Sequence, residues 1–354
     1  MADTPAARHA LLTVERFVAV LVFFFRKVAG RVPDGATAKI FNAVRHQSGI
    51  SINGRVLAAH HLPGPRIDDS AWINFKRMIK QWITHEQPGA PLDISWQDGQ
   101  KRRVHADGEG YFTTRFELPP DHGIPASITV AVANSDPPEL SQAPVLSAGA
   151  NARFLVVSDV DDTVLQTGAS SFWTMLRTTL FRNELTRTLV EGIGPLYQAL
   201  RDGVTGREDN PFFYVTSSPW NLEGFLKNIF DRTGLPQGAF FMTDWGLDRE
   251  KWFHRSHEDH KTDAIRRVLA WHPHLPAILL GDSGQRDPEI YTTILSEFPD
   301  RIAAILIRDA ARKKTRDADV EALLAEAASD HTPCLLTRST EEATIFLRDT
   351  GWIA

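Results

Sequence analysis

The second half of the chain alternates short apolar runs with segments of helical spacing. The runs are Phe154–Val157, Pro211–Val215, Ala277–Leu280 and Ile302–Ile307. Short runs without polar positions predict strands that are buried on both faces, as in a parallel sheet. Helical spacing lies between them, for example over residues 194–201 and 262–271. The pattern therefore predicts an α/β fold.

The first half has a different pattern, in which short strand-like segments are separated by turn signals such as Asp98-Gly99 and Asp107-Gly108. These segments are residues 50–57, 92–96, 102–105, 111–118 and 127–133. Strands so few and short predict a small β-sandwich, similar to transthyretin-like or immunoglobulin-like accessory modules, with one helix inserted at about residues 69–83. Such a module carries no chemistry by its fold.

Two domains are the expectation for 354 residues. Residues 134–150 are rich in Pro, Ser and Gly without periodicity, which is typical of a linker. The predicted organisation is an N-terminal helical segment (1–45), a β-sandwich (46–135), a linker (136–150) and an α/β domain (151–354).

Residues 11–25 are strongly apolar, but the unbroken run extends only from Phe17 to Phe25. That is too short to span a bilayer, and Arg26-Lys27 stand where a signal peptide would have small residues. Two interpretations stay open: a helix packed in the core, or an interfacial anchor with Phe23–Phe25 in lipid.

The composition, 42% hydrophobic and 23% charged, is that of an ordinary soluble globular protein. A net charge of −5 argues against nucleic acid as the main partner. The single cysteine, Cys334, permits no internal disulfide and no cysteine-based zinc site. We therefore expect a reducing, cytoplasmic location, with room for peripheral membrane association.

Acidic residues follow the first apolar run. Asp159 and Asp161 lie just past its end, where open α/β sheets bind ligands. In extended chain these two carboxylates point roughly the same way, so one could hold a metal and attack phosphorus while the other moves a proton. An Asp-rich turn is the plain alternative. An EF-hand loop is excluded, because Val164 and Ser170 stand where Gly and Glu are required.

The later run ends also carry polar residues. Ser218 is predicted to cap a helix that starts at Pro219, so that free N–H groups face the sheet edge and suit a phosphate. Lys261 lies just before a predicted helix, although a lone lysine is mostly solvated. Asp282 and Asp287 follow the third run, beside glycines that let the backbone approach a metal.

Three other patterns give weaker indications of a functional site. Ala58–His61 and Gly281–Gly284 superficially match the motifs of chymotrypsin-like proteases, but those enzymes are all-β. Histidines recur every third residue without forming a standard zinc pattern, and we expect them to flank the site or face solvent: His254, His257 and His260. A basic run is either a solvated face or a surface for membrane or lipid phosphate: Arg308, Arg312, Lys313, Lys314 and Arg316.

In order along the chain, these sites resemble the four signatures of the haloacid-dehalogenase (HAD) superfamily of phosphotransferases. The Asp-x-Asp-x-Thr of residues 159–163 is similar to the first signature, Thr216 to the second and Lys261 to the third, and Asp282 with Asp287 to the fourth. The resemblance implies a HAD-like (Rossmannoid) parallel sheet.

HAD enzymes carry a cap inserted after the first signature, which corresponds to about residues 166–189 here. This segment has apolar residues at helical spacing, which ordinary core packing also explains. The resemblance implies a small helical cap, and a small apolar cap would leave the site open to a large or membrane-borne substrate.

Longer stretches resemble the phosphatidate phosphatases of the actin-patch type and their bacterial relatives. These stretches are Ser158–Val164, Tyr214–Trp220, Leu235–Gly238, Thr243–Gly246, Gly281–Tyr291 and Pro299–Ile302, and the Leu-Pro-x-Gly turn is also similar to that of the lipin phosphatases. The resemblance covers about residues 150–310. It implies Mg²⁺-dependent hydrolysis of phosphatidate to diacylglycerol at a membrane surface.

The roles that follow are expectations. Asp159 is the nucleophile that forms an aspartyl-phosphate, and Asp161 is the general acid and base. Thr216 and Lys261 hold the phosphoryl oxygens. The Mg²⁺ ligands are Asp159, Asp161, Asp282 and Asp287, and the supporting phosphate contacts are Thr163, Ser217 and Ser218. Two alternatives stay open: hydrolysis of a soluble or polynucleotide phosphomonoester, and a scaffold with an idle site.

Overall fold

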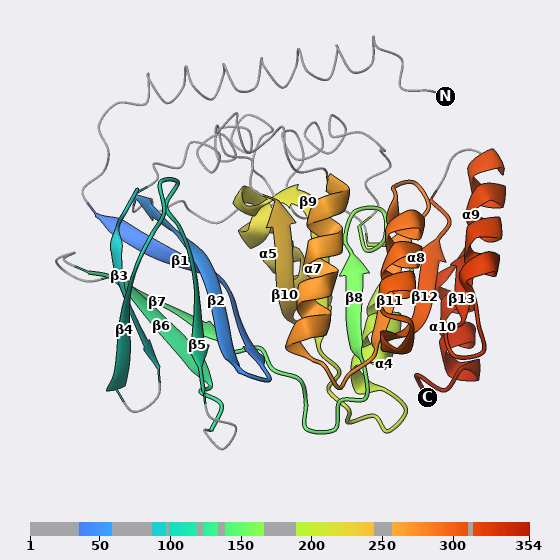
Figure 1. The fold of residues 1–354 in the computed structure, drawn as a ribbon, viewed down its shortest axis with the longest axis horizontal. Helices are drawn as coiled ribbons and strands as arrows, with labels where there is room; N and C mark the ends of the chain where they lie inside the picture. Colours follow the sequence, from blue (N-terminus) through green and yellow to red (C-terminus); the bar gives the residue numbers. More distant parts are fainter. Residues whose placement is uncertain are drawn as a thin grey trace, which may run out of the picture.

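The computed structural model describes residues 35–58, 87–96, 99–118, 123–133, 139–165, 189–243, 257–310 and 314–354. Its centre is a six-stranded parallel sheet in the order β10-β9-β8-β11-β12-β13 (Figure 1). The strands are β8 (Leu155–Asp159), β9 (Phe212–Pro219), β10 (Gly238–Thr243), β11 (Ala277–Asp282), β12 (Ile302–Arg308) and β13 (Cys334–Thr337). The predicted α/β class is confirmed.

Helices cover both faces of this sheet, and each face has its own hydrophobic core. One core includes α4 (Ile193–Asp202), α5 (Glu223–Thr233) and α10 (Thr340–Asp349), and the other includes α7 (His257–Trp271), α8 (Asp287–Glu297) and α9 (Lys314–Ala327). Two short 3₁₀ helices are η3 (Trp220–Leu222) and η4 (Pro299–Arg301). Burial on both sides explains why the strands contain no polar alternation. Within the described residues, no helix has the length and apolar composition that crossing a bilayer requires.

The first half forms two antiparallel sheets that share a third core. One sheet has the order β1-β2-β5 and the other β4-β3-β6-β7. The strands are β1 (Ala36–His46), β2 (Gly49–Ala58), β3 (Pro91–Trp96), β4 (Gln100–His105), β5 (Tyr111–Glu117), β6 (Ser127–Val132) and β7 (Leu140–Pro144). The division of the chain into domains stays a prediction.

Two expectations are wrong, one about the N-terminal segment and one about the linker. Strand β1 begins at Ala36, inside the predicted helical segment 1–45. A bulge between Ile40 and Asn42 breaks its alternation and hides the strand pattern. Strand β7 lies inside the predicted linker 136–150, as an edge strand, where proline and serine are tolerated. The helices expected over 11–25 and 69–83 lie outside the described residues, as does the cap expected over 166–189 except for Leu189.

Strand β1 packs against β10, the edge strand of the parallel sheet. The Asn42 side chain donates to the Phe240 carbonyl at 2.7 Å and accepts from the Phe240 N–H at 2.9 Å. The Phe41 ring stacks on Trp220 with 4.3 Å between centroids. The buried Glu223 carboxylate pairs with Lys39 and Lys227, each at 2.6 Å. These contacts satisfy edge backbone groups and fix the antiparallel sheets beside the segment that follows β9.

We expect Asn42→Ala to lower the free energy of unfolding by about 2 kcal/mol or more, because it leaves a buried N–H and a buried carbonyl of Phe240 without partners. Urea denaturation followed by circular dichroism measures this. The matched control is Asn53→Ala, at the half-buried register partner of Asn42 on β2. Equal losses in the two variants would contradict a specific role for Asn42.

Candidate active site

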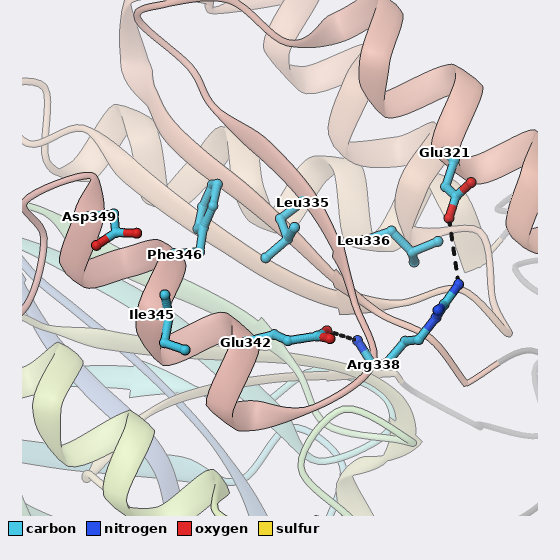
Figure 2. Close-up of a pocket in the computed structure, with 8 residues that line it drawn as sticks. All are labelled: Glu321, Leu335, Leu336, Arg338, Glu342, Ile345, Phe346 and Asp349. Carbon is cyan, nitrogen blue, oxygen red and sulfur yellow. Dashed lines mark hydrogen bonds and ion pairs between the residues drawn. The ribbon is translucent and has the colours of Figure 1, made fainter.

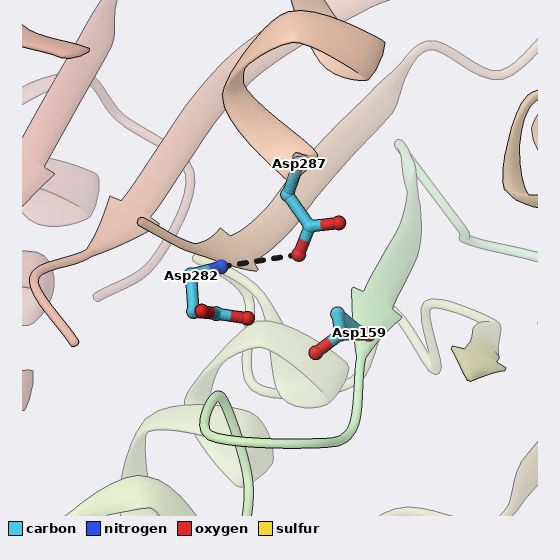
Figure 3. Close-up of side chains that lie close together, drawn as sticks. All are labelled: Asp159, Asp282 and Asp287. Carbon is cyan, nitrogen blue, oxygen red and sulfur yellow. Dashed lines mark hydrogen bonds between the residues drawn. The ribbon is translucent and has the colours of Figure 1, made fainter. Parts of the chain in front are cut away.

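Three buried carboxylates meet at the carboxyl edge of the parallel sheet (Figure 3). Asp159 is the last residue of β8, Asp282 is the last residue of β11, and Asp287 is the first residue of α8. One carboxylate oxygen from each lies within 4.8 Å of the others. Each is at most 1% exposed. The fold therefore concentrates negative charge at one buried point.

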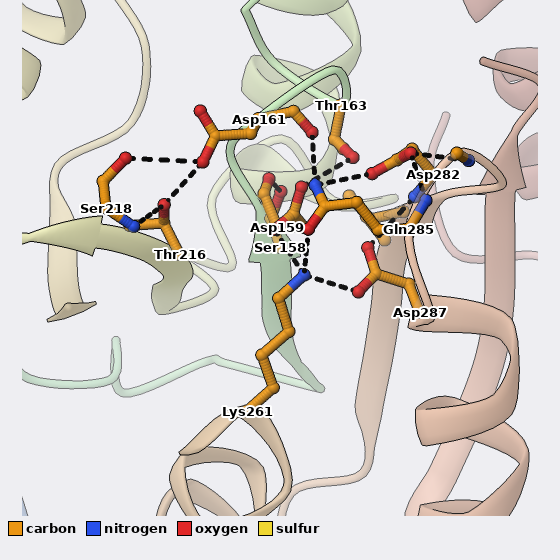
Figure 4. Close-up of polar contacts among 12 residues, drawn as sticks. Ser158, Asp159, Asp161, Thr163, Thr216, Ser218, Lys261, Asp282, Gln285 and Asp287 are labelled. Carbon is orange, nitrogen blue, oxygen red and sulfur yellow. Dashed lines mark hydrogen bonds and ion pairs between the residues drawn. The ribbon is translucent and has the colours of Figure 1, made fainter. Parts of the chain in front are cut away.

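Lys261, in the second turn of α7, is the cation that faces these carboxylates (Figure 4). Its Nζ donates to Asp159 Oδ1 at 2.8 Å and to Asp287 Oδ1 at 2.5 Å. Burial alone would lower the pKa of Lys261, but Asp159 and Asp287 outweigh burial and raise it. The amine is therefore charged in the folded protein.

The turn after β11 orients Asp282. Asp282 Oδ1 accepts from the N–H groups of Gly284 at 2.7 Å and Gln285 at 3.1 Å. Asp287 Oδ2 accepts from the Asp282 N–H at 3.2 Å. A Cβ at Gly281 would lie 2.7 Å from the Asp287 carboxylate, so this close approach requires glycine. Both oxygens of Asp287 thus have partners within the protein.

Asp159 at the end of β8 and Asp161 in the turn that follows have different hydrogen-bond partners. Asp159 Oδ2 accepts from the Thr163 hydroxyl at 3.3 Å, whereas Asp161 Oδ2 accepts from the hydroxyls of Thr216 at 2.8 Å and Ser218 at 3.4 Å. Asp162, between Asp161 and Thr163, has a left-handed backbone with φ of 55°. Asp161 therefore faces the end of β9, while Asp159 faces Lys261.

The prediction that Ser218 caps a helix is wrong. Strand β9 continues to Pro219, which pairs with Thr243 of β10, and the 3₁₀ helix starts only at Trp220. The Ser218 N–H donates to Thr216 Oγ1 at 3.0 Å instead of facing the sheet edge. The carbonyl of half-buried Ser217 accepts from Thr243 Oγ1 at 2.8 Å. The argument for a phosphate site at this helix end therefore fails, although Thr216 and Ser218 do reach the cluster.

The charges of the cluster are not balanced by the protein alone. Burial raises the pKa of Asp159 well above its usual range, against the attraction of Lys261. Burial, with the charge of Asp287, raises the pKa of Asp282 to about 7. Three carboxylates lie close together and the amine of Lys261 contacts two of them, so a further positive charge near Asp282 would be favourable.

The donor set fits a hard divalent cation. The Asp161 carbonyl oxygen and Asp282 Oδ2 converge on the Gln285 side-chain amide, which donates to them at 3.3 and 3.1 Å. Carboxylate and carbonyl oxygens are the ligands that Mg²⁺ prefers. Among the residues that the structure describes, the group of candidate ligands contains carboxylates and no histidine. His254 and the side chain of His257 lie outside the described residues, and His260 lies on α7.

Two arginines of the basic run make contacts at the site that the sequence analysis did not predict. Arg308 donates to the Asp162 carbonyl at 2.7 Å, and Arg316 donates to the carbonyls of Ser283 at 3.2 Å and Gln285 at 3.0 Å. The prediction of a solvated or membrane-facing basic run is wrong for these two residues. The position of Arg308 directly after a buried apolar run could have indicated that it lies at the site. The sequence contains no such indication for Arg316.

A separate groove of about 530 Å³ lies beside β13, between α9 and α10 (Figure 2). Its lining residues are Glu321, Leu335, Leu336, Arg338, Glu342, Ile345, Phe346 and Asp349. None of the predicted site residues lines it. The carboxylate cluster, and not this groove, is therefore the candidate active site.

Comparison with known proteins gives one family. Residues 154–309 match the family described as phosphatidate phosphatase APP1, catalytic domain. Phosphatidate phosphatase APP1 of Saccharomyces cerevisiae is 31% identical over 153 residues, which are 43% of this chain and 25% of that protein. An uncharacterized protein of Schizosaccharomyces pombe is 22% identical over 171 residues, 48% of this chain and 27% of that protein. The chain thus spans about a quarter of the length of these relatives.

Among solved structures, a carbohydrate acetylesterase from Xanthomonas citri is 12% identical, with 85% of this chain and 68% of that chain covered and a TM-score of 0.30. A similarity this low supports no conclusion about fold or function.

We expect Lys261→Met to lower the free energy of unfolding by about 3 kcal/mol in cation-free buffer, because it leaves buried Asp159 and Asp287 without a counter-charge. Adding Asp287→Asn should recover part of the loss, since one carboxylate is then neutral. Chemical denaturation measures both variants. Exposed Lys101→Met is the control, and an equal effect there would contradict the counter-charge role.

Proposed function

Because residues 154–309 belong to the family of the phosphatidate phosphatase APP1 catalytic domain, we propose that this protein is a Mg²⁺-dependent phosphomonoester hydrolase that converts phosphatidate to diacylglycerol. The observation that supports the chemistry best is the buried cluster of Asp159, Asp282 and Asp287 around Lys261. The printed name of the yeast relative supports the lipid substrate.

The strand order supports a HAD-like fold. From central β8 the chain goes outward to β9 and β10, then returns to the other side of β8 and builds β11, β12 and β13. The direction of winding therefore reverses between β8 and β11, and ligands of open α/β sheets bind at such a switch point. Asp159 and Asp282 end these two strands.

Asp159 is the proposed nucleophile. Its oxygens are oriented by Lys261 and Thr163, at 2.8 and 3.3 Å. One oxygen attacks phosphorus, the bond from phosphorus to the lipid oxygen breaks, and an aspartyl-phosphate forms. Water then attacks this phosphorus and regenerates the carboxylate with release of phosphate. Splitting the displacement in two makes each step easier than direct hydrolysis.

Asp161 is the proposed proton carrier. It gives a proton to the departing alkoxide in the first step and takes one from the attacking water in the second. The Thr216 and Ser218 hydroxyls, at 2.8 and 3.4 Å, hold its carboxylate in orientation. We also assign Thr216 the role of donating its hydroxyl to a phosphoryl oxygen when substrate is bound.

The divalent cation would be held by Asp159, the Asp161 carbonyl and Asp282. When bound, it neutralises charge on the phosphoryl oxygens and on the nucleophile. Lys261 supplies a second positive charge to the same oxygens. Asp287 was also predicted as a ligand, but its contacts with Lys261 and the Asp282 N–H favour a role in orienting these two groups.

We expect Asp159→Asn to reduce turnover by at least about a thousandfold with Mg²⁺ and a generic phosphate ester, because the amide cannot act as nucleophile. Asp162→Asn is the matched control, three residues away in the turn after β8: asparagine adopts its left-handed backbone readily, so most activity should remain. Circular dichroism verifies folding of both variants. Substantial turnover by folded Asp159→Asn would refute the nucleophile assignment.

We expect phosphate release from phosphatidate in liposomes to exceed release from a soluble phosphomonoester by about tenfold or more in kcat/KM, because the proposed substrate is presented at a membrane surface. The panel contains phosphatidate liposomes, p-nitrophenyl phosphate and a 5′-phosphorylated oligonucleotide, each with Mg²⁺. Preference for either soluble substrate would remove the lipid assignment and keep the chemistry. No hydrolysis of any substrate would favour an idle scaffold.

A further inference from the structure

Two arginines, one at the end of β12 and one in α9, bind the backbone of the two acidic turns. Arg308, the last residue of β12, donates to the Asp162 carbonyl in the turn after β8 at 2.7 Å. Arg316, in α9, donates to the Ser283 and Gln285 carbonyls in the turn after β11. One segment of chain thus contacts both turns that carry the carboxylates.

The guanidinium of Arg316 is fixed in one plane by a bidentate ion pair. It donates to Glu289 Oε1 at 2.7 Å and Oε2 at 2.9 Å. Because the guanidinium is planar, this pairing aims its remaining N–H groups at the two carbonyls. Glu289 lies in the first turn of α8, two residues after Asp287. Arg316 therefore joins α8, α9 and the turn after β11.

The carbonyls that Arg316 holds belong to the turn that orients Asp282. The N–H groups of Gly284 and Gln285 donate to Asp282 Oδ1 from within this turn. Asp282 lies close to two other buried carboxylates, whose like charge repels it. Without an anchor, the turn can relieve this repulsion by moving Asp282 outward.

We propose that Arg316 is a positioning residue for the cation ligand Asp282, and that Arg308 does the same for the turn after β8. Together the two arginines hold the acidic turns at the separation that one divalent cation requires. The inference rests on the proposed function, because it takes the carboxylate cluster to be a cation site.

The test measures Mn²⁺ binding to the full chain by electron paramagnetic resonance of the free ion. We expect Arg316→Met to raise the dissociation constant about tenfold and Arg316→Lys about threefold, since lysine keeps the charge but lacks the planar fork. Arg308→Met should raise it about threefold, because it has one carbonyl contact. Asp282→Asn should abolish binding, which assigns the signal to this cluster.

Arg338→Met is the matched control, because the Arg338 side chain is 74% exposed and its two ion pairs lie at 4.0 Å. Its dissociation constant should equal that of the wild type. A folded Arg316→Met that loses thermal stability but keeps wild-type Mn²⁺ affinity would overturn the proposal, since the arginine would then be only structural. Absence of Mn²⁺ binding by the wild type would overturn both this inference and the cation in the proposed function.

Discussion

Repulsion among buried carboxylates is the constraint on which the rest of the site depends. Asp159, Asp282 and Asp287 each place an oxygen within 4.8 Å of the others in a buried region, and a single amine contacts two of them, Asp159 and Asp287. Such a cluster persists only where opposite charge and N–H donors compensate it. Lys261, two backbone N–H groups and a glycine that admits close approach supply that compensation. The order of strands brings these groups together from distant parts of the sequence.

The α/β class, four strands of the parallel sheet and several residues that meet at its edge could be predicted from the sequence, whereas β10 and β13 were not predicted. Runs such as Phe154–Val157 are buried on both faces, which makes them recognisable, and parallel strands bring the residues after them to one edge. The convergence of Asp159, Lys261 and Asp282 followed from this rule together with the family resemblance. Their chemical roles stay proposals.

The misses have physical causes that a local sequence pattern does not show. Strand β1 was missed because a bulge disrupts its alternation, and its side-chain contacts with β10 come from about two hundred residues away. The Ser218 cap failed because β9 continues to Pro219, and because the Ser218 hydroxyl donates to Asp161 instead of accepting from a helix N–H. Arg316 had no sequence signal, because its partners become neighbours only when α8 and α9 pack together.

The segment that matches the family, residues 154–309, is shorter than the unit that the contacts define. A chain cut to these limits would lose β1, and the backbone of β10 would become exposed. Buried Glu223 would also lose its ion pair with Lys39. An uncovered edge strand invites pairing with another chain. Self-association is thus one expected failing of a minimal fragment, and loss of the Arg316 contacts with the turn after β11 is another.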